Sequence, residues 1–311
     1  MVNLPIEIIK IARPLHWIKN LAVFAALIFT GNLLERSLFT EIFWAFWVFN
    51  LATSATYIFN DILDAKQDKL HPIKKNRPIA RGSLPIPIAS AASLFLALTA
   101  LVLAAGISSL LFWLITGYLL LQASYSLLLK HLAIVDILVI ATGFVLRVYA
   151  GAFVINAHLS VWFLLCVISV ALLLASAKRR SEIGTLGSGA TTRKSLAHYS
   201  QELLDCYVTM FGNAAWMSWA LFTFFESPRA AVPVWLFLAE LSRATTINKL
   251  LMLTIPITIF GIMRYQSLIF RNRTEAPEKL LLTDKPLVIS VVIWGFMVIW
   301  ILYGGVSNQP I

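Results

Sequence analysis

The chain has 311 residues, of which 59% are hydrophobic and only 13% carry a charge. Average soluble domains contain about 25% charged residues, so the composition excludes an ordinary soluble domain. The formal net charge of +10 is compatible with nucleic-acid binding. However, the basic residues gather in short loops between apolar stretches, which favours membrane orientation and excludes a nucleic-acid partner. The sequence therefore predicts an all-α polytopic membrane protein that forms a single integral membrane domain over residues 1–311.

The elements can be predicted in chain order. Residues 3–13 alternate apolar and charged side chains with helical spacing, which predicts a short helix in the membrane interface. We expect nine membrane spans to follow, near residues 20–35, 39–59, 86–105, 108–129, 132–155, 158–177, 203–225, 246–265 and 286–304. The partly apolar segment 226–245 fits either an interfacial helix or part of a span.

Polar loops near residues 60–85, 178–202 and 264–285 separate these spans. With nine spans, the N-terminus and these three loops lie on one side, together with most of the 25 Lys and Arg residues. The positive-inside rule makes this side cytoplasmic. We therefore expect a protein of the cytoplasmic (plasma) membrane whose polar loops face the cytosol.

The stretch from Asn60 to Gly82 is densely charged, with three Asp and six Lys or Arg residues in 23 positions. A helix continuing to Asp68 would place Asp61, Asp64 and Asp68 on one face. Carboxylates at the end of a membrane span need a positive partner, and Mg²⁺ bound to phosphate oxygens is a common one. The alternative is a solvated charged turn. We predict that the three Asp residues are metal ligands of a diphosphate site.

The basic residues after this stripe fit the other half of such a site. Lys74 and Arg77 are predicted phosphate ligands, because Pro78 directly after Arg77 indicates a shaped loop and not a solvated helix face. Lys75 and Arg81 are weaker candidates that also suit interface anchors.

Further candidates stand at the ends of other spans. Tyr125 and Lys130 close the fourth span and could reach one ligand, although a Lys there is often an anchor. Lys178, Arg179, Arg180 and Glu182 close the sixth span and suit a second phosphate. His16 and Lys19 stand where a lipid headgroup would rest, although His16 also fits a structural role. Asp136 and Arg147 lie inside the fifth span; Arg147 suits a structural role and Asp136 stays open.

Two motifs in the acidic stretch carry a family resemblance. Asn60-Asp61-x-x-Asp64-x-x-x-Asp68 is followed by His71-Pro72-x-Lys74-x-x-Arg77-Pro78-Ile79-Ala80-x-Gly82. This pattern resembles the first motif of the UbiA superfamily of intramembrane prenyltransferases. The resemblance implies about nine transmembrane helices around a central cavity and Mg²⁺-dependent substrate binding at two acidic motifs.

The chain departs from aromatic prenyltransferases of that superfamily at the second motif, because no second Asp-rich run follows the sixth span. Lys178-Arg179-Arg180-Ser181-Glu182 and Arg193-Lys194-Ser195 stand there instead. Other matching stretches are Arg13-Pro14-x-His16-Trp17-x-Lys19-Asn20, Tyr125 to Lys130, Gly143 to Arg147 and Ala276 to Lys285. Together these features resemble the polyprenyl-phosphate phosphoribosyltransferase branch. One acidic site and one basic site also match the two separate phosphate clusters of phosphoribosyl diphosphate.

The resemblance implies an enzyme that transfers 5-phosphoribose from phosphoribosyl diphosphate to a polyprenyl phosphate and releases diphosphate. Asp61, Asp64 and Asp68 would hold Mg²⁺, and Asp61, Asp64 and Arg77 would act in catalysis. The predicted substrate-binding residues are His16, Lys19, Asn60, Lys74, Arg77, Tyr125, Lys130, Lys178, Arg179, Arg180 and Glu182. An aromatic prenyltransferase is the first alternative, and a transporter or lipid-binding scaffold is a remote one. A homo-oligomer stays open.

Overall fold

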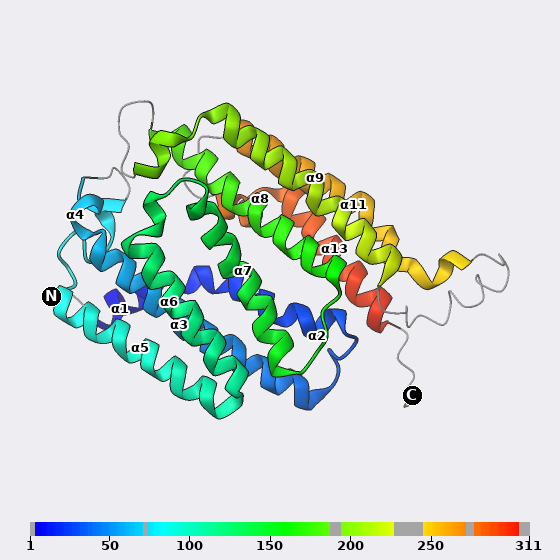
Figure 1. Ribbon diagram of the computed structural model, residues 1–311, viewed down its shortest axis with the longest axis horizontal. Coiled ribbons are helices and arrows are strands. Elements are labelled where there is room, and N and C mark those ends of the chain that lie inside the picture. Colours follow the sequence, from blue (N-terminus) through cyan, green and yellow to red (C-terminus); the bar gives the residue numbers. More distant parts are fainter. Residues whose placement is uncertain (1–3, 71–73, 187–193, 227–244, 272–276, 305–311) are drawn as a thin grey trace. The chain divides into compact units, whose positions relative to one another are not determined.

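The computed structural model (Figure 1) describes residues 4–70, 74–186, 194–226, 245–271 and 277–304. All elements over these residues are α-helices or 3₁₀-helices, which confirms the predicted all-α class. The chain divides into two compact units. Unit 1 comprises residues 1–27, 33–157 and 191–198, and unit 2 comprises residues 28–32, 158–190 and 199–311. The single-domain organisation stays a prediction, and each unit is described by itself.

Unit 1 is built around one long helix, α3. Its elements are α1 (Leu4–Ala12), η1 (Pro14–Phe24), the start of α2 (Ala25–Phe29), α3 (Arg36–Leu63), α4 (Ala65–Asp68), η2 (Lys74–Asn76), α5 (Ile86–Ile107), α6 (Ser109–Leu127), η3 (Leu129–His131), α7 (Val135–Val154) and η4 (Lys194–His198). α3 packs against α1, η1, α5, α6 and α7. Phe49 and Ala52 of α3, with Ile115 of α6, lie in the resulting apolar core.

Two features explain how helices in unit 1 begin and approach one another. Pro85 precedes α5 and Pro87 occupies its first turn, where a missing backbone N–H costs nothing. Gly151 of α7 lies directly against the backbone of Val23 in η1. A side chain at position 151 would collide with that carbonyl, so the glycine allows the two elements to pack closely.

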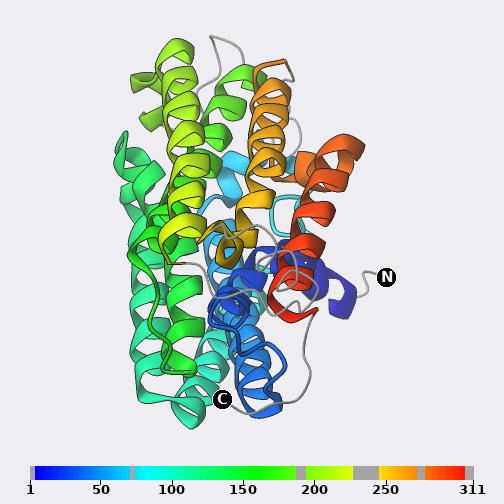
Figure 2. The same cartoon turned by 90° about the vertical axis from the view of Figure 1, so that its right-hand side faces the viewer.

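Unit 2 contains α8 (Val161–Leu186), α9 (Gln201–Phe225), η5 (Thr245–Thr254), α11 (Ile255–Arg271), α12 (Pro277–Thr283) and α13 (Lys285–Tyr303). α8 packs along α9, α9 along α11, and α11 along α13; α9 and α11 run side by side in Figures 1 and 2. Ser200 and Asp284 cap α9 and α13 by accepting bonds from the amides of Leu203 and Leu287. Such caps satisfy amides that a helix start leaves unpaired.

Seven helices over the described residues are long and apolar enough to cross a membrane: Arg36–Leu63, Ile86–Ile107, Ser109–Leu127, Val135–Val154, Val161–Ile183, Leu250–Arg271 and Lys285–Tyr303. They coincide with seven of the nine predicted spans. Near the predicted first span the structure has a shorter apolar helical stretch, Pro14–Phe29. The predicted seventh span corresponds to α9, which has 25 residues but is not among the seven. Most of the segment 226–245 lies outside the described residues.

Several predicted boundaries were wrong. The first span was predicted to start at residue 20, but helical structure begins at Pro14, whose fixed backbone suits a helix start. The loop predicted to begin at Lys178 is helical to Leu186. The loop predicted from residue 264 likewise begins only after Arg271. Within α8, Arg179 pairs with Glu182 one turn on, which suits a helix. Arg264 of α11 pairs with Asp284 at the start of α13.

Candidate active site

The acidic stretch forms a buried cluster in unit 1. α3 carries Asn60 and Asp61 and ends at Leu63; Asp64 lies between α3 and α4 with a right-handed helical backbone (φ −85°, ψ −3°), and α4 ends at Asp68. The amides of Asp64 and Asp68 donate to the carbonyls of Asn60 and Asp64, so helical hydrogen bonding continues through the acidic stretch. The side chain of Asn60 donates to Asp64 Oδ2 at 3.0 Å. Asp61, Asp64 and Asp68 are only 2%, 8% and 5% exposed, so their charges require partners.

Three basic side chains supply those partners. Arg13 Nη2 and Arg77 Nη1 both donate to Asp61 Oδ1, at 2.5 and 3.0 Å. Arg77 Nη1 also donates to Asp68 Oδ2 at 2.6 Å. Lys130 Nζ donates to Asp64 Oδ1 at 2.6 Å. Three carboxylates and three cations therefore balance one another, and the three cations come from residues far apart in the sequence.

Burial raises the pKa of Asp68 above its usual value, and the nearby Arg77 opposes this shift without cancelling it. The neighbouring charge of Asp61 adds to the increase, and the charge of Lys74 reduces it. A carboxyl group with a raised pKa gains free energy from any additional positive charge beside it. An additional cation beside Asp68 would therefore favour its ionised form.

The acidic cluster fits Mg²⁺ in the chemistry of its donor atoms. All of them are hard oxygens, and Asn60 contributes a buried Oδ1 that has no hydrogen-bond partner in the structure. No three His, Cys, Asp or Glu side chains in the described part of the chain converge tightly enough to hold one metal ion. Mg²⁺ does not need such a group, because it commonly binds through one or two carboxylates, substrate phosphates and several waters.

Other predicted site residues share unit 1 with the acidic cluster. Lys74 lies in η2, in the same loop as Arg77. The ring of His16 lies 5.4 Å from that of Tyr57, one helical turn before Asp61. Lys19 and Tyr125 are half-buried, on η1 and α6.

The second predicted basic group lies in unit 2. Arg179 is completely buried on α8 and donates to Glu182 Oε2 at 2.6 Å. Arg180 donates to Asp205 Oδ1 of α9 at 2.6 Å. Asp205 was not predicted, because the pairing depends on how α8 packs against α9. Lys178 is half-buried on the same turns of α8.

The chain after α8 returns to unit 1 beside the acidic cluster. Ser195 in η4 is buried, and its hydroxyl donates to the backbone carbonyl of Lys130 at 2.8 Å. This contact fixes η4 against η3, which positions Lys130 for its ion pair with Asp64. His71, Pro72 and Arg193 of the quoted motifs lie outside the described residues.

Two residues of unit 1 that sequence reasoning did not select also contribute. Arg13 contacts Asp61 directly. Glu7 on α1 is buried and accepts hydrogen bonds from Ser83, Lys10 and Arg81. These bonds, with that from Ser83 the strongest influence, lower the pKa of Glu7 to about 2. Arg13 could have been found from the sequence, because it opens one of the quoted motifs; the long-range partners of Glu7 carry no such signal.

Arg147 has a structural environment, as predicted. Its guanidinium donates to Asn20 Oδ1 at 2.6 Å and to Tyr118 Oη at 3.3 Å, and it also contacts the carbonyl of Gly143. Three aromatic rings surround it, those of Phe49, Tyr118 and Phe144. Asp136 lies eleven residues away, about 16 Å along the helix, so the two do not pair. Asp136 accepts a bond from the amide of Ile137 at 2.9 Å.

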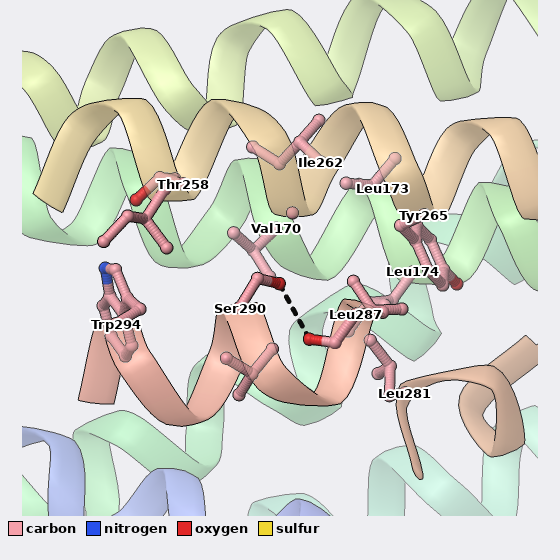
Figure 3. Close-up of a pocket in the computed structure, with 13 residues that line it drawn as sticks. Val170, Leu173, Leu174, Thr258, Ile262, Tyr265, Leu281, Leu287, Ser290 and Trp294 are labelled. Carbon is pink, nitrogen blue, oxygen red and sulfur yellow. Dashed lines mark hydrogen bonds between the residues drawn. The ribbon is translucent and has the colours of Figure 1, made fainter. Parts of the chain in front are cut away.

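Unit 2 also contains an apolar cavity of about 280 Å³, lined by residues of α8, α11, α13 and the segment around α12 (Figure 3). Ser290 points toward it, but its hydroxyl donates back to the carbonyl of Leu287 at 2.7 Å. Among the described residues that line it, none is charged, so this lining is unsuited to a phosphate group. The acidic cluster is therefore the better candidate for an active site.

Residues 21–239 match the UbiA prenyltransferase family. The chain therefore belongs to this family of integral membrane proteins. It is 33% identical to decaprenyl-phosphate phosphoribosyltransferase of Corynebacterium glutamicum, over 97% of this chain and 88% of that protein. It is 34% identical to the protein of the same name from Mycolicibacterium smegmatis, over 94% of this chain and 91% of the relative.

Solved structures of the family share the fold. A UbiA homolog from Archaeoglobus fulgidus bound to DMAPP and Mg²⁺ superposes with a TM-score of 0.66 at 16% identity, covering 94% of this chain and 99% of that one. A digeranylgeranylglyceryl phosphate synthase superposes with a TM-score of 0.62 at 15% identity, covering 96% and 98%. At these identities the likeness shows a common fold and nothing about the substrate.

Proposed function

We propose that this protein transfers 5-phosphoribose from phosphoribosyl diphosphate to the phosphate of a polyprenyl phosphate and releases diphosphate. One observation carries the proposal: a buried cluster of carboxylates and cations at the end of a membrane span, in a chain similar over nearly its full length to decaprenyl-phosphate phosphoribosyltransferases. The cluster suits a diphosphate, and the similarity favours a phosphoribosyl donor with a lipid acceptor.

In the proposed reaction, the bond from ribose C1 to the diphosphate oxygen breaks and a bond from C1 to an oxygen of the lipid phosphate forms. The electron pair of the broken bond leaves with the diphosphate. Arg77 and Lys74 are proposed to stabilise this departing charge, since fixed positive groups act most strongly where charge develops. A phosphate monoester, with a second pKa near 6, is already largely dianionic at neutral pH. The acceptor therefore needs no general base.

We propose that Asp61, Asp64 and Asp68, together with Asn60, supply ligands for Mg²⁺, with one or two of these carboxylates on an ion and diphosphate oxygens and waters completing its shell. Bound there, Mg²⁺ would neutralise diphosphate charge and orient the leaving group. Arg77 and Lys130 would then exchange their carboxylate partners for phosphate oxygens. This exchange keeps every buried charge paired, which burial demands.

The second phosphate of the donor needs its own site. Arg179 and Arg180, with Lys178 and Glu182 beside them, are proposed to seat the 5-phosphate. Tyr125 is proposed to help hold the donor, and His16 and Lys19 to contact the lipid phosphate from η1. We further propose that the site opens to the cytosol from the cytoplasmic membrane, where a soluble donor and a lipid acceptor can both reach it.

A transfer assay tests the proposal. Purified protein would receive Mg²⁺, polyprenyl phosphate and phosphoribosyl diphosphate labelled in its ribose. The expected result is label in the lipid fraction, dependent on both the lipid phosphate and Mg²⁺. A parallel reaction would contain a labelled prenyl diphosphate and an aromatic acid. Label in the organic product of that reaction alone would contradict the proposal and favour aromatic prenylation.

A further inference from the structure

Arg13 occupies a backbone conformation that arginine rarely adopts. It lies between α1 and η1 with φ 55° and ψ 61°, in the left-handed region. Pro14 follows it and disfavours the right-handed helical region for residue 13. Glycine is the residue that tolerates the left-handed conformation best. An arginine at such a position indicates that the side chain itself is required there.

The side chain of Arg13 is the second guanidinium that contacts Asp61. Arg77 donates to Asp61 Oδ1, and Arg13 donates to the same oxygen. Arg77 also bonds to Asp68, whereas, among the described residues, Arg13 reaches the acidic cluster through Asp61 alone. An anion with several oxygens, such as a diphosphate, can accept hydrogen bonds from both guanidinium groups in place of Asp61.

The guanidinium of Arg13 is also held in place before any ligand binds. It lies over the ring of Tyr57, 5.0 Å from its centroid, and a cation over an aromatic face is stabilised there. The helix before Arg13 is fixed as well, because Glu7 of α1 bonds to Ser83 and Arg81 of the loop after Arg77. The Arg13 side chain is 21% exposed, so it retains access to a ligand.

We propose that Arg13 is a donor-binding residue that contacts an oxygen of the diphosphate group. In the free protein it bonds to Asp61, and in the complex the diphosphate replaces Asp61 as its acceptor. Recognition of the diphosphate depends on the left-handed conformation of Arg13 before Pro14, because this conformation directs the guanidinium toward the acidic cluster. The identity of the whole donor rests on the proposed function, whereas the contact with diphosphate does not.

The test compares Arg13→Asn, Arg13→Lys and Lys10→Gln with the wild type. Asparagine tolerates the left-handed conformation but lacks the positive charge. Lysine keeps the charge but lacks the planar set of N–H donors of a guanidinium group. Lys10 is an exposed cation at the end of α1, so Lys10→Gln removes the same charge outside the cluster. The measurements are calorimetric binding of Mg²⁺-diphosphate, KM for each substrate, and thermal stability.

We expect Arg13→Asn to weaken diphosphate binding and raise the donor KM by about tenfold to a hundredfold, with the lipid KM and the unfolding temperature nearly unchanged. Arg13→Lys should recover part of the binding, and Lys10→Gln should match the wild type. Unchanged diphosphate binding in Arg13→Asn would overturn the inference, as would a loss that follows reduced stability. A wild type that binds diphosphate through Arg13 but transfers no phosphoribose would contradict the proposed function alone.

Discussion

Asp61 shows how this chain handles buried negative charge. Its Oδ1 accepts bonds from Arg13 and Arg77, which come from opposite sides of α3 in the sequence. The sequence predicted that the acidic stripe needs a positive partner, and the structure shows that the chain supplies three. A ligand must therefore replace these internal ion pairs, which makes ligand affinity sensitive to each member of the cluster.

Replacing Asp61 by Asn should reduce kcat at least about a hundredfold, because the amide cannot supply the negative charge that a metal–diphosphate complex needs. The side chains have nearly the same size, so the fold should persist. Steady-state kinetics and thermal unfolding of the purified variant measure both effects. Glu41→Gln, an exposed carboxylate on the same helix, is the matched control. Full activity in Asp61→Asn would refute the assignment.

Lys130 and Asp64 form the most enclosed ion pair of the cluster, with side chains 5% and 11% exposed. Lys130→Met should destabilise the protein by about 3–5 kcal/mol, because it leaves a buried carboxylate without its cation. Adding Asp64→Asn to Lys130→Met should restore much of that stability. Denaturant unfolding measures the effect, with exposed Lys69→Met as the control. Equal stabilities of both Lys variants would show that the ion pair contributes little.

At the level of single elements, α1 contributes to the packing around the acidic cluster. Ile11 packs in an apolar cluster with Ile58, Ile79 and Leu84, and Glu7 bonds to the loop that carries Arg77. The helix thereby connects the N-terminus to the acidic cluster. The helical spacing of residues 3–13 predicted this helix, but only the structure shows which of its residues pack against the rest of unit 1.

The hydrogen bonds that Glu7 accepts predict that their contribution to the stability of the folded protein depends on pH. Its pKa in the folded protein is about 2, below the ordinary 4.5. The carboxylate therefore stabilises the folded chain fully above pH 4.5, and this contribution disappears as the pH falls toward 2. Glu7→Gln should unfold a few degrees below the wild type at neutral pH. The difference should narrow under acid; a constant difference across this pH range would contradict the assignment.

Much of the fold was predictable, because long apolar stretches identify membrane helices with little ambiguity. Hydrophobicity does not predict the end of a helix whose last turns carry charged residues. α8 continues through Lys178–Leu186 because Arg179 pairs with Glu182 one turn on and Arg180 pairs with Asp205 on α9.

The sequence predicted which residue types form the candidate site, but not which cation pairs with which carboxylate. Asp61, Asp64 and Asp68 were selected because of their spacing after a span, and Arg77 because Pro78 follows it. Lys130 was selected as a substrate-binding residue, and the structure shows in addition that it pairs with Asp64. Ion pairs between residues so distant in sequence depend on tertiary packing, and the periodicity of a sequence does not predict such contacts.

For the whole molecule, the two units divide the proposed chemistry. Unit 1 carries the acidic cluster with its cations, and unit 2 carries Arg179 and Arg180. The return of η4 to Lys130 ties the chain after α8 to the acidic cluster.

The proposed orientation can be measured at the two ends of α3. After removal of Cys166 and Cys206, a single cysteine would be placed at Lys69 or Glu35, both exposed. In intact cells, a membrane-impermeant maleimide should label Glu35→Cys and leave Lys69→Cys unlabelled until the membrane is opened, because the acidic cluster is proposed to face the cytosol. The reverse pattern would place the cluster outside and contradict the cytosolic site.

The most direct test of the central claim is the mass of the lipid product in a competition. Purified protein with Mg²⁺ would receive phosphoribosyl diphosphate and a prenyl diphosphate together, with polyprenyl phosphate and an aromatic acid as acceptors. We predict a polyprenyl phosphate that has gained one phosphoribosyl group, with one diphosphate released for each product molecule. A prenylated aromatic acid, with the polyprenyl phosphate unchanged, would contradict the account.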